Sequence, residues 1–508
     1  MQLTWNDSYR DLIGGLDILG VRQLDQGLEL QLVGGITTVA PRARYLTLVT
    51  WALDALYRRL LDEGDGELKW TEDEQDATLT RLEFLVAAAT QAGSRQGEAG
   101  NLTGIVGSDV YREILGELAA AGHAAFPPGR RPGVVNAYGS PAQAFGLLAA
   151  TTEGGPLALT PRGQVLLEQV PESQNARQLL FAAGHLTVAQ LDQVRPVFSL
   201  NGLGSSPHER AALVSALDEP PGTAASTRTD RFRATRAWAI ALLQLEPTDG
   251  DGLVDRAYAD LVSGRATTEI ALLWGEVALR KRVHFALELL LAALANRLEA
   301  DRGSTVPQVV RDLAVDLEDE LPPASVERAI GAGPIDFTAS WPSWCDRVPD
   351  DAFLVVPPHR NLGRLPPAWQ MAVALALLAA TERQSRAART NGVVKERDRQ
   401  AMEQSFGLLA GHQGSIADLA TRVLRDEVAS RHLRHTMRKM SQRQSNSLRF
   451  FPRGESLVPT GTGTGAGFSL TRMSAVLQVM ADIGHLRSEG GVFTPTAAGL
   501  AWAEKAAR

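Results

Sequence analysis

The sequence predicts a mainly α-helical, multidomain protein with a helical middle region, winged helix-turn-helix modules and a small α/β region at the N-terminus. Three observations lead to this fold class: the length of 508 residues, the helical period of most apolar residues, and two similar helix–hairpin–helix segments. A chain of this length exceeds what one hydrophobic core usually supports, which favours about two to four domains.

The composition is that of a globular protein, with 44% apolar and 21% charged residues. The net charge of −7 gives the whole chain no attraction to nucleic acid, so any such attraction has to come from a local patch. Cys345 is the only cysteine, which excludes an intramolecular disulfide and a cysteine-based zinc cluster. These features fit a cytoplasmic protein.

No segment is typical of a membrane protein. The first fifteen residues, "MQLTWNDSYRDLIGG", mix charged and polar residues and do not resemble a signal peptide. The most apolar runs, 285–295 and 371–380, are too short to cross a bilayer. We therefore expect two buried helices and no membrane contact.

The N-terminal part is expected to combine extended and helical segments. Residues 27–42, "GLELQLVGGITTVAPR", alternate apolar and polar residues and predict a strand or hairpin. Residues 44–64 have the apolar period of an amphipathic helix, and residues 276–300 predict the central helix of the middle domain. Proline-rich and polar joints then divide the chain into an N-terminal region (1–135), a winged-helix unit (136–175), a helical middle domain (176–365), a basic helical region (366–454) and a C-terminal winged helix (455–508).

Two segments of the chain resemble each other. Residues 147–168 and 479–504 each contain a helix, a Glu-Gly-Gly turn, a short apolar strand and a Thr-x-x-Gly sequence before a last helix. The paired glycines suit a tight hairpin, and Thr160 and Thr496 suit helix N-caps. Helix, two-stranded wing and closing helix form the second half of a winged helix-turn-helix. The alternative is two unrelated helix–hairpin units.

The glycine run "GTGTGAG" (461–467) raises the question of a phosphate-binding loop. Phe468 and Ser469 follow it where a nucleotide triphosphatase has Lys-Ser/Thr, and its spacing differs from the dinucleotide fingerprint. We expect a flexible linker, with Ser469 capping a helix whose apolar face is Met473, Val476, Leu477, Met480 and Ile483.

A strongly basic stretch precedes this run. Between 422 and 453 the chain has nine arginines and lysines, opposed only by Asp426 and Glu427. Arg431, Arg434 and Arg438 share one face of a predicted helix, whereas Leu433, Met437 and Met440 occupy another face that is expected to pack. Such a cationic ridge suits DNA phosphates. The alternatives are a solvated helix face or a surface that docks an acidic partner protein.

The DNA hypothesis assigns phosphate or groove contacts to residues of the basic stretch and of the C-terminal module. These residues are Arg431, Arg434, His435, Arg438, Lys439, Arg443, Arg449, Arg472 and Arg487. Arg42 and Arg44 could also bind a phosphate, but a charged helix entry over aromatic Tyr45 and Trp51 is the preferred interpretation.

No coherent active site emerges from the sequence. There is no His-Glu-x-x-His motif and no Gly-x-Ser-x-Gly elbow, so no catalytic residue, metal site or cofactor is predicted. The triplet Glu67-Leu68-Lys69 matches the tail of a restriction-type nuclease motif, but such triplets are common by chance. A metal-dependent nuclease is kept as an alternative function.

"GITTVAPRARYLTLVTWAL" (35–53), "HLRHTMRKMSQRQSNSLRFFPRGESLVP" (432–459) and the final wing resemble uncharacterised winged-helix accessory proteins of bacterial phage-defence islands. The resemblance implies a non-enzymatic DNA-binding or assembly component of a defence or DNA-maintenance complex, beside an ATPase, helicase or SMC-like partner. The layout is also similar to kleisin-type subunits, which makes a protein-docking scaffold the rival function. On that alternative Met473, Met480 and the wing would be buried against the partner.

Overall fold

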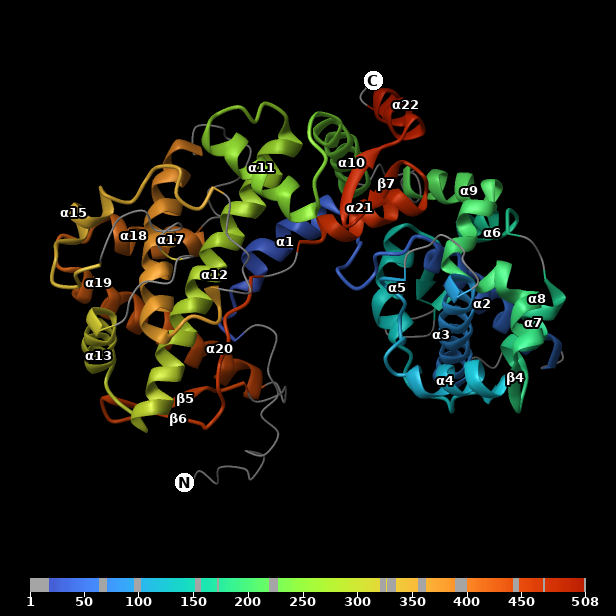
Figure 1. Ribbon diagram of the computed structural model, residues 1–508, viewed down its shortest axis with the longest axis horizontal. Coiled ribbons are helices and arrows are strands. Elements are labelled where there is room, and N and C mark those ends of the chain that lie inside the picture. The colour runs from blue at the N-terminus through green and yellow to red at the C-terminus, as the bar shows by residue number, and fades with distance from the viewer. Residues whose placement is uncertain are drawn as a thin grey trace. The chain divides into compact units, whose positions relative to one another are not determined.

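The computed structural model describes residues 18–63, 71–95, 102–150, 157–170, 173–218, 227–319, 326, 335–354, 362–388, 400–441, 447–468 and 471–506. In these residues the protein is mainly helical, as the sequence predicts (Figure 1). The strands form two-stranded antiparallel sheets of three or four residues per strand. Within the described residues, three of these sheets pair neighbouring strands, and the fourth pairs β1 with β4 across several intervening elements.

The chain divides into two compact units, and both are discontinuous in sequence. Unit 1 comprises Met1–Glu29 and Val254–Leu470, and unit 2 comprises Leu30–Leu253 and Thr471–Arg508. The main segment of unit 1 is thus inserted in the chain of unit 2. Helices α1 (Arg22–Leu32) and α11 (Gly250–Val262) each continue across a boundary. The five sequence-based ranges are finer than this division and stay predictions.

Unit 1 is built on helix α12 (Glu269–Asp301), which is buried over most of its length. Helix α17 (Pro367–Ala388) packs beside it (Figure 1). Both contain the apolar runs that the sequence assigns to buried helices. The other elements of unit 1 are α13 (Val306–Asp319), α15 (Trp341–Cys345), α18 (Gln400–Ala410), α19 (Ile416–Val423), the π-helix η5 (Leu424–Ala429), α20 (Ser430–Ser441), β5 (Phe450–Arg453) and β6 (Ser456–Pro459).

The strand or hairpin predicted at 27–42 is wrong, because its first six residues belong to helix α1 (Arg22–Leu32) and the described residues after them form no strand. The buried positions Asp25, Glu29 and Leu32 of α1 recur at i, i+4 and i+7, which is a helical face rather than a strand face. Two of them are carboxylates that reach α12 within unit 1: Glu29 lies 3.2 Å from Lys281, and Asp25 lies 3.4 Å from His284. The prediction followed the alternation of apolar residues, whereas two of the residues that face the core here are carboxylates.

Unit 2 contains the remaining helices and hairpins. Its helices are α2 (Arg44–Glu63), α3 (Glu72–Arg95), α4 (Arg112–Ala121), α5 (Gly133–Ala144), α6 (Pro161–Leu167), α7 (Gln174–Phe181), α8 (Val188–Phe198), the 3₁₀ helix η2 (Leu200–Ser205), α9 (Pro207–Asp218), α10 (Thr227–Leu245), α21 (Met473–Asp482) and α22 (Ala497–Ala506). Its strands are β1 (His123–Ala125), β2 (Leu148–Ala150), β3 (Leu157–Leu159), β4 (His185–Thr187), β7 (Leu486–Glu489) and β8 (Val492–Pro495).

The α/β character expected of residues 1–135 is not confirmed. The described part of this range has four complete helices, the start of α5 at Gly133, and one three-residue strand, β1, which pairs with β4 outside the range. The expected helix at 44–64 is present as α2, and its inner face is part of the core of unit 2.

The two similar segments adopt the same local structure within unit 2. In each, a helix ends at a left-handed glycine (Gly146, Gly484), a hairpin follows, and a threonine begins the next helix. The Thr160 hydroxyl donates to the Gly146 carbonyl and accepts from the Gly163 N–H; Thr496 does the same with Gly484 and Gly499. The predicted strand pairs and threonine caps are confirmed, and so is the Glu-Gly-Gly turn of the second segment; the turn predicted at 153–155 lies outside the described residues.

A third hairpin, β5–β6, repeats the C-terminal hairpin inside unit 1. Both have a four-residue register closed by a two-residue turn, from Phe450↔Pro459 and Leu486↔Pro495 inward. Thr460 donates to the Leu448 carbonyl as Thr496 donates to Gly484. We call 133–167, 430–460 and 473–506 the N-terminal, middle and C-terminal hairpin modules.

The middle and C-terminal modules also share a third strand position. Ser304 forms an isolated bridge to Leu457, the second residue of β6, and Thr248 bridges Phe493, the second residue of β8. The next residue caps a helix in both cases: the Thr305 hydroxyl accepts from Gln308 N–H, and the Asp249 carboxylate accepts from Gly252 N–H. A bridge residue followed by a capped helix thus accompanies each hairpin: α13 follows Ser304 within unit 1, and α11, which begins in unit 2 and continues into unit 1, follows Thr248.

The glycine run is not the flexible linker that we expected. Thr464 exchanges two hydrogen bonds with the Asn296 amide of α12, at 3.0 and 3.2 Å. The Gly467 N–H donates to Glu288, and Phe468 lies edge-on to Phe285. The segment 461–468 is thus fastened along α12 by side chains that the sequence separates by more than a hundred residues. The proposed cap Ser469 lies outside the described residues.

Candidate nucleic-acid interface

Helix α20 carries the centre of the predicted basic face, and its inward side is polar. The buried residues of this helix are His432 and Thr436. The expected packing face of Leu433, Met437 and Met440 is wrong, because Met437 is 65% exposed and Met440 is 38% exposed. Hydrogen bonding of His432, rather than hydrophobic period, decides which side of α20 faces the core.

His432 fastens the base of the middle hairpin to α20. Its Nε2 accepts from the Arg449 N–H at 3.0 Å, so the proton resides on Nδ1, which donates to the Ile18 carbonyl at 3.1 Å. The ring packs against Phe450 at 4.8 Å between centroids. Burial, opposed by the Ile18 bond, lowers the pKa of His432 to about 4, and the ring is neutral at physiological pH. The hairpin is therefore held against α20 by contacts in the interior.

The structure separates the predicted cations of α20 into exposed and paired groups. Arg434 and Arg438 are exposed, and Lys439 and His435 are half-buried. Arg434 Nε donates to the Ser430 carbonyl, and Arg438 lies 3.4 Å from His435 Nδ1. Arg431 belongs to a different group, because Glu427 of the preceding turn binds it at 2.5 Å and its side chain is 17% exposed.

The other predicted contact residues have diverse positions. Arg449 is 4% exposed, and burial lowers the pKa of its guanidinium, so it is not part of an accessible surface. Arg472 is half-buried and donates to the Ile36 carbonyl. Arg487 is exposed on β7, whereas Arg443 lies outside the described residues.

Helix α21 is too buried to enter a groove. Seven of its ten residues are buried, including the predicted apolar face, which is confirmed. Met473 and Met480 are fully buried within the chain. The Asp482 carboxylate at the end of the helix binds the Arg42 guanidinium at 3.0 Å and the Ala43 N–H at 2.9 Å. The C-terminal module is therefore attached to other residues of unit 2 through the end of α21.

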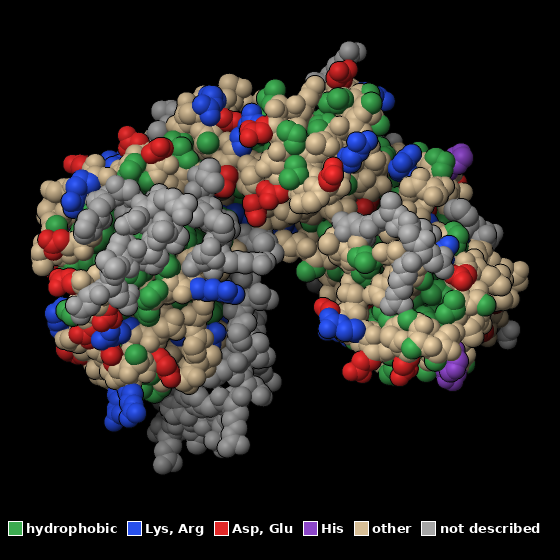
Figure 2. Space-filling model, in the orientation of Figure 1, with side chains coloured by type: hydrophobic (Ala, Val, Ile, Leu, Met, Phe, Trp, Pro, Cys, Tyr) green, Lys and Arg blue, Asp and Glu red, His purple; other side chains and the backbone are tan. Residues whose placement is uncertain are grey.

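Positive charge is local rather than continuous. On the face drawn in Figure 2, Lys and Arg side chains alternate with Asp and Glu among the described residues. Exposed arginines elsewhere commonly have a carboxylate beside them, as Arg112 has Asp109 and Arg265 has Asp260. Arg434 and Arg438 differ, since the side-chain contacts described for them are to a carbonyl and to an imidazole.

Arg42 and Arg44 have the structural role preferred from the sequence. Both are 2% exposed at the entry of α2, where Arg44 forms a two-pronged ion pair with the buried Glu209. Tyr45 and Tyr138 stack beside them with centroids 4.6 Å apart. Neither guanidinium is accessible to a phosphate.

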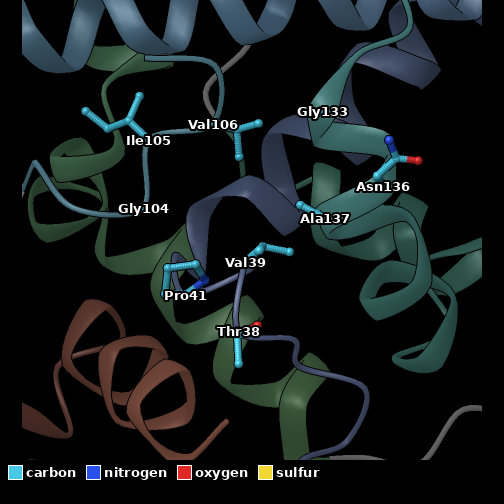
Figure 3. Close-up of a pocket in the computed structure, with 9 residues that line it drawn as sticks. All are labelled: Thr38, Val39, Pro41, Gly104, Ile105, Val106, Gly133, Asn136 and Ala137. Carbon is cyan, nitrogen blue, oxygen red and sulfur yellow. The ribbon is translucent and has the colours of Figure 1, made fainter. Parts of the chain in front are cut away.

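A pocket of about 510 Å³ opens beside this helix entry in unit 2 (Figure 3). Three segments line it: Thr38, Val39 and Pro41; Gly104, Ile105 and Val106; and Gly133, Asn136 and Ala137. Tyr45 accepts from the Val106 N–H at 3.0 Å and Tyr138 from the Arg42 N–H at 2.9 Å, which fixes the walls. Its lining has no ionisable side chain, so it offers no acid, base or charge for catalysis.

The described residues contain no group of three His, Cys, Asp or Glu side chains placed to hold a metal ion. The nuclease-like triplet Glu67-Leu68-Lys69 lies outside them. No helix of the described part is long and apolar enough to span a membrane.

Sequence analysis missed the middle hairpin as a relative of the C-terminal one. A sequence signal for the similarity was present. The end of each hairpin has a Pro-Thr pair, Pro459-Thr460 in the middle module and Pro495-Thr496 in the C-terminal module, at the same distance from a glycine turn. Arg453, next to that turn in the middle hairpin, is an exposed cation of the same module as Arg434 and Arg438. No local sequence pattern predicts the β-bridges that Ser304 and Thr248 form, because their partners are distant in the sequence.

Comparison of the chain with protein-family models, with curated protein sequences and with solved structures finds no match. The functional argument therefore rests on the geometry of the chain itself.

Proposed function

We propose that the protein is a non-enzymatic DNA-binding component and that unit 1 contacts duplex DNA through the exposed side of α20 and the hairpin β5–β6. The observation that carries the proposal is the pair Arg434 and Arg438, exposed at i and i+4 on a helix that is fixed to a hairpin. Phosphate contacts supply most of the affinity of DNA-binding proteins, and arginine is well suited to make them.

We interpret the middle and C-terminal hairpin modules as the last helix and wing of two winged helices. In each case a helix, a bridge residue and a capped helix occur earlier in the chain, and α20 or α21 then precedes the hairpin after intervening elements. In a helix-turn-helix protein the last helix of the motif enters the major groove. Exposure favours the middle module for this role, because α20 has two buried residues and α21 has seven.

The biological setting is a proposal that rests on the resemblance alone. It is a bacterial antiphage or DNA-maintenance complex with an ATPase, helicase or SMC-like partner, and co-purification from the native host would test it. Met473 and Met480 are buried within the chain, whereas the wing that the scaffold alternative also invokes is exposed from Arg487 to Val492, so this alternative stays beside the DNA proposal.

Binding to a labelled DNA duplex tests the DNA proposal, with salt varied from about 50 to 200 mM. Arg434→Gln/Arg438→Gln should weaken binding and reduce the slope of log affinity against log salt by about 2, since each lost phosphate contact removes about 0.9. Equal binding by the wild type and this variant would contradict the proposed surface.

Arg112→Gln/Arg265→Gln is the matched control. It removes the same charge from two arginines whose side chains are 77% and 68% exposed and paired with aspartates outside the proposed surface. Its affinity and salt slope should equal those of the wild type. An equal loss in both double variants would mean that net charge, rather than α20, governs binding.

A further inference from the structure

An apolar side chain stands in the middle of the cationic face of α20. Positions 434, 437, 438 and 441 recur at i, i+3, i+4 and i+7, so Met437 lies between Arg434 and Arg438 on one side of the helix. Met437 is 65% exposed, more than any other large apolar residue described in unit 1. Covering this thioether side chain with an apolar group of a partner would gain the free energy of burial that the fold itself does not gain here.

The neighbouring contacts keep this side chain accessible. Arg434 Nε binds the carbonyl of Ser430, one turn towards the N-terminus, and Arg438 lies against His435, also towards the N-terminus. His432 and Thr436 hold the opposite side of the helix in the core, so α20 cannot rotate to bury Met437 without breaking the two hydrogen bonds of His432. The surface is therefore cationic at its edges and apolar at its centre.

B-form DNA offers the complementary surface. Its major groove is about 12 Å wide and admits an α-helix, with phosphates along both edges. The apolar group that the groove displays is the 5-methyl of thymine, which is recognised by apolar side chains. An acidic protein surface could also bind the two arginines. The middle module has a third exposed cation, Arg453, on the hairpin that His432 joins to α20, and several cations in one module favour an extended polyanion.

We infer that Met437 is the base-contacting residue of α20 and that it recognises thymine through its 5-methyl group, while Arg434 and Arg438 bind the flanking phosphates. This inference rests on the proposed DNA-binding function and adds to it a preference for thymine-containing sites. The C-terminal module has no equivalent, because the corresponding surface of α21 is buried.

The test compares two duplexes of identical sequence, one with thymine and one with deoxyuridine, which lacks only the 5-methyl group. The full-length wild type should bind the deoxyuridine duplex about threefold to fivefold more weakly, the effect of burying one methyl group. Met437→Ala should bind both duplexes equally, and Met437→Leu should retain the preference. Met440→Ala, which changes the less exposed methionine three residues on, should discriminate as the wild type does.

The outcomes separate this inference from the proposed function. Salt-dependent binding of the wild type with equal affinity for both duplexes would overturn the role of Met437 and leave the phosphate contacts standing. Discrimination that survives in Met437→Ala would also overturn it. Absence of binding to either duplex at low salt would overturn both proposals and leave an acidic protein surface as the occupant of this face.

Discussion

Histidines 284 and 432 are both buried in unit 1, yet their surroundings shift their pKa values in opposite directions. Burial alone disfavours the imidazolium form, and at His432 it prevails, lowering the pKa to about 4. Burial opposes protonation of His284 too, but Asp25 at 3.4 Å and Glu288 at 3.1 Å outweigh it and raise its pKa to about 9. The two neighbouring carboxylates therefore keep His284 protonated at neutral pH in spite of its burial.

His284→Gln should therefore remove a stabilisation that depends on pH. A raised folded-state pKa contributes stability that is fully present below the unfolded pKa of 6.5 and is lost as pH rises through about 9. The difference in unfolding free energy between wild type and variant should fall by on the order of 1–3 kcal/mol across this window. Denaturant titrations at several pH values measure it, and a constant difference would show that His284 is neutral in the fold.

At the scale of elements, the hairpin modules show how one threonine and one glycine fix a helix against a hairpin. The Thr496 hydroxyl bridges the Gly484 carbonyl and the Gly499 N–H, which brings Gly499 directly against the His485 carbonyl. The N-terminal module repeats this with Thr160, Gly163 and Leu147. The middle module keeps its threonine but continues into the glycine segment, so it has no closing helix.

Gly499→Ala should destabilise unit 2, because a methyl group there would overlap the His485 carbonyl oxygen. Forced overpacking of this kind costs about 1–3 kcal/mol. Gly116→Ala is the control: this exposed glycine in the middle of α4 has open space around it, and the change should stabilise by about 0.5–1 kcal/mol. Thermal and denaturant unfolding measure both variants, and equal stability of Gly499→Ala and wild type would contradict the close helix–hairpin contact.

At the scale of the whole molecule, the C-terminal module belongs to the same unit as residues that precede it by more than two hundred positions. Gly250 lies against the backbone of Ser474, so the chain leaves and re-enters unit 2 at neighbouring points. Two further contacts in unit 2 join residues on either side of the inserted segment 254–470. Thr248 forms a β-bridge with Phe493, and Arg42 forms an ion pair with Asp482. Insertions are tolerated at sites where the two chain ends lie close together.

A chain of residues 30–253 joined to 471–508 by a short glycine-serine linker should fold cooperatively. Circular dichroism and a single thermal transition would report this. The matched control ends at residue 253 and lacks α21, whose burial and Asp482–Arg42 ion pair complete the core, and it should not fold cooperatively. If the joined chain also failed to fold, unit 2 would not be an independent domain.

The sequence by itself determined features that depend on neighbours a few residues apart. The helical period identified α2, α12 and the apolar face of α21, and glycine and threonine spacing identified the N-terminal and C-terminal hairpins with their caps. The excess of arginine around α20 was also visible. Such patterns are local because helix period, turn conformation and capping act within one or two turns of chain.

Only the tertiary structure decided which of these residues are accessible. It made α1 a helix through the pairing of its carboxylates with α12, fastened the glycine run to Asn296 and Glu288, and buried Arg449 while exposing Met437. Each outcome depends on a partner distant in the sequence, and the free energy of burying a charge or a methyl group depends on that partner. The sequence thus shows the excess of positive charge around α20, and the tertiary structure shows which of those charged side chains are exposed on the surface proposed to bind DNA.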